Sequence, residues 1–126
     1  MDLSVRHPDP STEFFTPERC WILEAWSSPS DPLVSLARAR VEAGVTTQLH
    51  RSRGVDERYL IVEGSGIVRV GWQPPQVVGP GDVIAIPAGT PQQSTNDAET
   101  DLIFYCICSP PFTPECYENL EPAESP

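Results

Sequence analysis

Short runs rich in apolar, β-branched and aromatic residues recur along the chain, separated by clusters of turn-forming residues. The runs cover residues 20–26, 34–41, 46–50, 58–64, 66–72, 82–87, 92–95 and 101–108, and the clusters between them include QPPQ, GPGD, PAGTP and NDAE. No 12-residue stretch keeps the i, i+3, i+4, i+7 apolar spacing of an amphipathic helix. Because short strands punctuated in this way are typical of sandwiches and barrels, the pattern predicts an all-β fold.

The chain length and the composition of its ends predict a simple organisation. A chain of 126 residues fits one compact domain. Residues 1–12 and 118–126 are rich in Pro, Ser and acidic residues with little to bury, so we expect flexible tails there and a single barrel over 13–117. The segment FTPECYENL, near the end, is expected to form a short helix or an arm across the barrel.

Charge narrows the classes of partner. Eight arginines, no lysine and 18 acidic residues give a net charge of -10, which disfavours nucleic acid and anionic lipid surfaces. Without lysine, a Schiff-base mechanism has no side-chain amine. The N-terminus does not resemble a signal peptide and no apolar run approaches the length of a membrane span, so we expect a soluble, cytoplasmic protein. The four cysteines are accordingly expected to be buried thiols and not disulfides.

Two spaced motifs carry the chemistry. From Gly44 the chain reads G-x5-H-x-S-x4-E-x6-G, and from Gly81 it reads G-x5-P-x-G-x2-Q-x3-N. This pair resembles the two-part signature of the cupin superfamily, G-x5-H-x-H-x4-E-x6-G and G-x5-P-x-G-x2-H-x3-N, and the flanks look like those of small single-domain cupins. The resemblance implies a double-stranded β-helix, the jelly-roll or cupin barrel.

The resemblance also implies a site inside the barrel. In metal-binding cupins the two histidines and the glutamate of the first motif and the histidine of the second converge on one divalent ion. Those positions are His50, Ser52, Glu57 and Gln92 here, so two of three histidines are replaced. Strand alternation independently puts Gln48, His50 and Ser52 on one face, and Glu57 and Tyr59 on one face of the next strand.

Two interpretations of this site stay open. His50, Glu57 and Gln92 could form a three-ligand site for Zn, Mn, Fe or Ni, weaker than the family's full set. Alternatively, a metal-free barrel pairs His50 with Glu57 by a hydrogen bond, with Gln92 satisfying a remaining polar group. That pair could still serve as general acid and base.

Several further residues are candidates for lining the pocket. Arg38 and Arg40 alternate with Ala37 and Ala39, so both lie on one face of their strand. Pointing inward they would suit a carboxylate or phosphate ligand; pointing outward they are solvated. The other candidates for ligand contact are Gln48, Ser52, Tyr59 and Tyr105.

Three functions are consistent with these residues. The first is a small enzyme acting on a polar, anionic or carbonyl-containing metabolite, with His50 and Glu57 as metal ligands or as catalytic groups. The second is a metal-free ligand-binding or sensor module, and the third is a barrel with a vestigial pocket whose role is assembly. We also expect a homodimer, formed through the apolar edge strand of residues 20–26.

Overall fold

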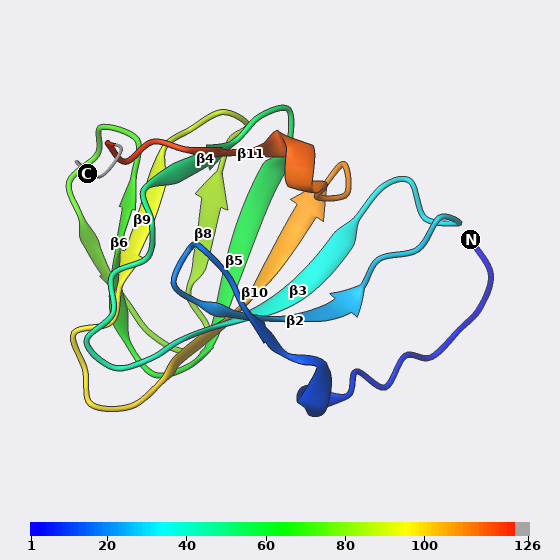
Figure 1. Cartoon of the computed structure of the whole chain (residues 1–126), viewed down its shortest axis with the longest axis horizontal. Coiled ribbons are helices and arrows are strands. Elements are labelled where there is room, and N and C mark those ends of the chain that lie inside the picture. Colours follow the sequence, from blue (N-terminus) through cyan, green and yellow to red (C-terminus); the bar gives the residue numbers. More distant parts are fainter. Residues whose placement is uncertain (123–126) are drawn as a thin grey trace.

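Two antiparallel sheets form the walls of one barrel in the computed structural model, which describes residues 1–122 (Figure 1). In spatial order, the six-stranded sheet contains β1 (Phe14–Phe15), β2 (Trp21–Trp26), β3 (Ser35–Val41), β10 (Leu102–Ser109), β5 (Asp56–Glu63) and β8 (Val83–Ile86). The five-stranded sheet contains β11 (Tyr117–Asn119), β4 (His50–Ser52), β9 (Gln92–Thr95), β6 (Gly66–Val70) and β7 (Gln76–Val78). Two 3₁₀ turns, η1 (Pro10–Thr12) and η2 (Pro114–Cys116), complete the elements. The predicted all-β double-stranded β-helix is confirmed.

Strict alternation along β5 decides which side chains enter the barrel. Glu57, Tyr59 and Ile61 are buried, whereas Arg58 and Leu60 between them face solvent. On β4, His50 and Ser52 are likewise buried on either side of a half-exposed arginine. Because side chains on a strand alternate between its two faces, the carboxylate of one sheet and the imidazole of the other enter the same interior.

The barrel interior is apolar in one part and polar in another. The apolar cluster is almost completely buried and includes Val41, Ile61, Val68, Ile86, Leu102 and Phe104. The buried polar side chains include Ser35, His50, Ser52, Glu57, Gln92 and Ser94. The apolar cluster therefore supplies the burial that stabilises the barrel and fixes the strands that carry the polar groups.

The motif residues that carry no reactive group have structural roles. Gly64 has φ of +77°, and a Cβ there would lie 2.4 Å from the carbonyl oxygen of Asp101. A side chain at that position is therefore excluded twice, by backbone conformation and by space. Asn96 is fully buried and donates its amide to the carbonyl oxygens of Val41 (2.9 Å) and Thr100 (2.8 Å).

The C-terminal segment differs from its prediction as a tail. β11 runs from Tyr117 to Asn119 and pairs with β4, and Glu121 bonds to Arg19, so residues 118–122 belong to the barrel wall. The expected helix or arm at 112–120 is a 3₁₀ turn followed by this strand. Residues 123–126 of the predicted tail lie outside the described part. Over residues 1–122, no helix has the length and apolar character needed to cross a membrane.

Candidate functional site

A cavity of about 380 Å³ lies inside the barrel and is lined by both sheets and by segments near both chain ends. Its polar lining includes Glu18, Ser52, Glu57, Tyr59, Tyr117 and His50. Its apolar lining includes Phe14, Ile22, Trp26, Leu36, Phe104 and Phe112. A polar cluster set in apolar walls is the usual composition of a small-molecule site.

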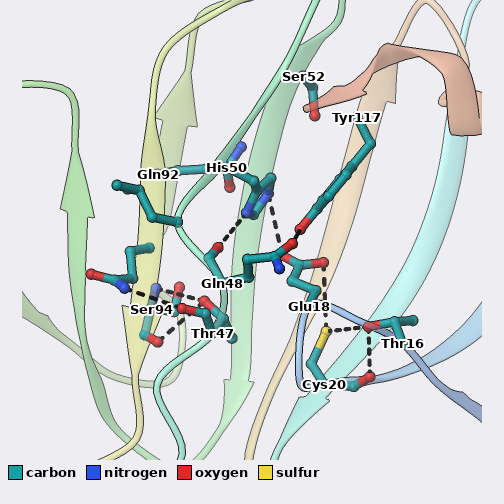
Figure 2. A network of polar contacts seen from close by, with 12 residues as sticks. Thr16, Glu18, Cys20, Thr47, Gln48, His50, Ser52, Gln92, Ser94 and Tyr117 are labelled. Carbon is teal, nitrogen blue, oxygen red and sulfur yellow. Dashed lines mark hydrogen bonds and ion pairs between the residues drawn. The ribbon is translucent and has the colours of Figure 1, made fainter. Parts of the chain in front are cut away.

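The His50 ring lies between the Gln48 carbonyl oxygen and the Glu18 carboxyl. The His50 Nδ1 lies 2.7 Å from the Gln48 carbonyl oxygen, which can only accept, so Nδ1 carries a hydrogen (Figure 2). The Nε2 lies 3.2 Å from Glu18 Oε1, within ion-pair distance. Burial raises the pKa of the Glu18 carboxyl, although the nearby imidazole opposes that shift. Nε2 and Oε1 are thus close enough for one proton to pass between them.

A tight turn delivers Glu18 to this position. The backbone N–H of Arg19 donates to the Thr16 carbonyl oxygen (3.0 Å), and Arg19 adopts a left-handed conformation with φ of 71°. This turn directs Glu18 into the barrel and Arg19 outward to Glu121. The Cys20 thiol, 3.7 Å from Glu18 Oε2, contacts the second carboxyl oxygen. Glu18 keeps 21% of its side chain exposed, so its proton can exchange with solvent.

Glu57 is held by a separate network. Its Oε1 accepts from Ser52 Oγ (2.6 Å) and from Gln92 Nε2 (2.8 Å). The side-chain amide oxygen of Gln92, Oε1, accepts in turn from the Tyr59 hydroxyl. The other carboxyl oxygen, Oε2, has only a weak contact with Cys108 Sγ at 3.9 Å. One oxygen of Glu57 is thus fixed by two donors, and the other is left for a ligand.

Tyr117 covers His50 from the C-terminal strand. The two rings stack with centroids 4.8 Å apart and planes 19° from parallel. The Tyr117 hydroxyl donates to Gln48 Oε1 at 2.5 Å, as Figure 2 shows. Burial raises the pKa of Tyr117, so this side chain remains a neutral phenol. Gln48 therefore fixes His50 through its backbone and Tyr117 through its side chain.

Of the three residues predicted as metal ligands, Glu57 keeps an open donor atom, Oε2, whereas the donor atoms of Gln92 and His50 face other side chains. The side-chain oxygen of Gln92 accepts a hydrogen bond from the Tyr59 hydroxyl, and its side-chain nitrogen donates to Glu57. The remaining His50 nitrogen faces Glu18. Over residues 1–122, no three His, Cys, Asp or Glu side chains gather in a group able to hold a metal ion. The donor set thus does not fit the metal that the family resemblance implies.

Only some of the predicted site residues line the cavity. His50, Ser52, Glu57 and Tyr59 line the cavity, and Gln92 lies directly behind Glu57. The expected hydrogen bond between His50 and Glu57 does not form, because each has a nearer partner of its own. Sequence reasoning missed Glu18 and Tyr117, since neither belongs to a motif.

Arg38, Arg40 and Tyr105 are not in the cavity lining. On β3 it is Ala37 and Ala39 that line the cavity, so the alternation carries both arginines to the outer face. There both bond to Glu13, and Tyr105 lies opposite Arg38 on the neighbouring strand. The outward alternative for the two arginines is therefore the one the structure shows.

The cysteines form part of the wall without reactive character. All four are free, and Cys20, Cys106 and Cys108 line the cavity. Burial raises the pKa of Cys108 to about 12 and that of Cys106 also well above its usual value. Neutral thiols at these positions behave as small apolar groups.

These features define the class as a small jelly-roll β-barrel with buried polar groups around an internal cavity. The family model for the Cupin domain matches residues 37–108, more than half of the chain. The chain belongs to this family. Its site departs from the family signature by carrying Ser52 and Gln92 where the signature has histidines.

Known proteins resemble this chain at two levels. The uncharacterized protein MJ1618 of Methanocaldococcus jannaschii is 37% identical over 87 residues, which are 69% of each chain. The nucleoside dehydratase Pac13 of Streptomyces superposes with a TM-score of 0.74 at 16% identity, over 93% of this chain and 92% of its own. A cupin 2 conserved barrel domain protein of Salinispora arenicola gives 0.72 at 16% identity, over 86% and 89%. The two structural likenesses establish the shared fold.

Proposed function

We propose that this protein is an enzyme that catalyses proton transfer on a small molecule bound inside the barrel. The pair of His50 and Glu18, 3.2 Å apart, carries this proposal because it borders the same cavity as a second carboxylate. Such a pair can donate a proton and take it back within one catalytic cycle. The carboxylate of Glu57, with Oε2 left open, is the complementary base.

The arrangement suits reactions in which a proton leaves one atom and another is delivered nearby. Glu57 Oε2 removes a proton from carbon, and His50 Nε2 delivers a proton to an oxygen of the same substrate. In an isomerisation, the electron pair of the C–H bond forms C=C while the C=O π pair takes the delivered proton on oxygen, which gives a conjugated enol. Glu57 then returns its proton to a different carbon of that enol, and His50 takes back the hydroxyl proton. In a dehydration, the electron pair of the C–H bond forms C=C while the C–O bond breaks and the hydroxyl leaves with the delivered proton as water. The similarity to Pac13, a nucleoside dehydratase, agrees with the second type.

Apolar walls strengthen this chemistry. Phe104 and Leu36 are among the residues that surround the polar cluster, and they keep bulk water away from the reacting atoms. Electrostatic interactions inside such a site are screened less than in water. The network from Tyr59 through Gln92 holds Glu57 in one orientation, which positions the base before the substrate arrives.

The experiment uses a protein-free metabolite extract incubated with the purified protein in D₂O. Mass spectrometry follows deuterium uptake and the loss of 18 mass units over time. We expect at least one metabolite to change with the wild type, and the rate to fall about 100-fold or more in His50→Gln and Glu57→Gln. The matched control is Glu118→Gln, a surface carboxylate paired with Arg51. No time-dependent change in any metabolite would sink the proposal.

A ligand-binding or sensor module is the second candidate. Residues 16–19 and 117–121 form the cover of the cavity, because they bring Glu18 and Tyr117 against His50. An ordered cover favours retention of a ligand. Saturable binding without turnover in the same experiment would support this candidate. A metal-dependent enzyme is less well supported, because the Gln92 oxygen and the His50 nitrogen would first have to give up Tyr59 and Glu18. A cytoplasmic location and a homodimer remain predictions.

A further inference from the structure

We infer that the cavity is selective for a ligand that is uncharged or positively charged at its buried end, and that it rejects phosphates and carboxylates. This inference rests on the proposed function and names the substrate class of the same site. It replaces the anionic metabolite that the sequence favoured when Arg38 and Arg40 were candidates for the lining.

The charges on the cavity wall carry the first step. Three carboxyl side chains, Glu18, Glu24 and Glu57, line the cavity, and among residues 1–122 His50 is the only lining side chain that can become cationic. The Nε2 of His50 already faces the Glu18 carboxyl, 3.2 Å from Oε1. A phosphate or carboxylate placed beside Glu57 would therefore meet a like charge with no cation to compensate it, and burial of an unpaired charge is costly.

The positions of the arginines also support rejection of anions, because each arginine lies outside the cavity lining. Arg38 and Arg40 bind Glu13 on the outer face of the six-stranded sheet. Arg19 binds Glu121, and Arg51 and Arg53 approach Glu118. Arg58 bonds to Ser109, and Arg6 stacks on the Trp26 ring with its guanidinium carbon 4.9 Å from the centroid. Arg69, on β6, faces solvent. The chain contains no lysine, so no arginine or lysine side chain lines the cavity.

The two ends of the cavity define the shape of the ligand. The polar end offers Glu57 Oε2 as an acceptor, and a hydroxyl or ammonium group is the donor it fits. Phe14 and Phe112 also line the cavity and remain 47% and 41% exposed, so they lie toward its opening. A ligand with an apolar or aromatic body and one terminal donor group matches both ends.

Three probes that differ only in that terminal group test the inference: tryptamine, tryptophol and indole-3-acetate. Isothermal titration at neutral pH measures each against the wild type. We expect tryptamine and tryptophol to bind at least tenfold more tightly than indole-3-acetate. Glu57→Gln should weaken tryptamine about tenfold and change tryptophol by about twofold or less, whereas Glu118→Gln should leave all three unchanged.

The outcomes separate this inference from the proposed function. Binding of indole-3-acetate as tight as that of tryptophol overturns the inference, as does the absence of binding by all three probes at millimolar concentration. Turnover of an anionic metabolite in the D₂O experiment would leave the acid–base function standing and overturn the charge selectivity alone. Charge-selective binding combined with no turnover of any metabolite would do the reverse.

Discussion

Arg19 and Glu121 form a bidentate ion pair that joins the turn at residues 16–19 to the C-terminal segment at residues 117–121. The Arg19 Nη1 and Nη2 atoms lie 3.0 and 2.8 Å from the two carboxyl oxygens of Glu121. Glu121 also accepts from the backbone N–H of Leu49, next to His50. The two segments joined in this way supply Glu18 and Tyr117, the two side chains that contact the His50 ring.

Loss of this ion pair should loosen the cover of the cavity without unfolding the barrel. In Glu121→Gln we expect faster amide hydrogen exchange at Leu49 and Leu120, by about tenfold, because their local opening becomes easier. Exchange at Leu102, which lies in the apolar cluster, should stay unchanged. The control Glu118→Gln removes a neighbouring ion pair and should leave Leu49 as protected as in the wild type. Equal protection of Leu49 in wild type and Glu121→Gln would contradict the role of the pair.

The same ion pair predicts opening of the cover at acid pH. The Arg19 guanidinium and the Leu49 N–H lower the pKa of Glu121. For a carboxyl whose pKa is lowered by folding, the stabilisation is present above the unfolded value, about 4.3, and is lost as pH falls through the folded value. We therefore expect Leu49 exchange, corrected for intrinsic rates, to rise below about pH 4.3 in the wild type. Glu121→Gln should show no such rise.

Glu18 predicts the opposite dependence of stability on pH. Burial raises the pKa of its carboxyl, so the folded protein binds this proton more tightly than the unfolded chain. That contribution to stability is complete below about pH 4.3 and is lost as pH rises through the folded value, at about 1.4 kcal/mol per unit of pKa difference. Urea unfolding of Glu18→Gln, compared with wild type from pH 4 to 8, should show the variant gaining relative stability toward pH 8. Parallel pH profiles would contradict a raised pKa.

The sequence predicted the strands that are long and alternate between buried and exposed residues. It thereby also predicted the site residues that those strands carry. β5 alternates from Asp56 to Val62, which was enough to place Glu57 and Tyr59 inside. The resemblance to the cupin signature implied that Gln92 lies near His50, and the two residues form a cross-strand pair. The run at 46–50 was placed too early, because β4 begins only at His50. Strands of two or three residues such as β1, β7 and β11 carry too little pattern to be recognised.

The partner of His50 could not be predicted because it comes from outside the motifs. Glu18 lies 32 positions before His50 and reaches it only through a turn in which Arg19 takes a left-handed conformation. Arginine gives no local signal for that conformation, unlike glycine. The partner of the Gln92 side-chain oxygen could not be predicted either. Tyr59 was expected to line the pocket, but not to donate its hydroxyl to this oxygen, which was expected to bind a metal ion.

Removal of the Tyr59 hydroxyl should impair catalysis more than it impairs folding. In Tyr59→Phe the buried Gln92 oxygen loses its donor, which costs about 1–3 kcal/mol of stability. The freed amide can then rotate and release Glu57, so we expect turnover of the substrate found in D₂O to fall about tenfold or more, with a smaller change in KM. Tyr105→Phe, outside the cavity lining, is the control and should retain wild-type turnover. A loss of stability with unchanged turnover would remove the positioning role of Tyr59.

The edge of the six-stranded sheet predicts a homodimer that two opposed substitutions can test. β1 pairs with β2 only at Trp21 and Ile22, which leaves the rest of that edge without a neighbouring strand among residues 1–122. Phe15, on β1, is 54% exposed, and exposed edges with apolar side chains favour pairing with another strand. Light scattering at micromolar concentration should give twice the chain mass of 13.9 kDa. Phe15→Glu should reduce the mass to that of one chain, whereas Val77→Glu, on the exposed edge strand of the other sheet, should leave the dimer intact. A wild-type mass of one chain, or dissociation by Val77→Glu alone, would contradict pairing through β1 and β2.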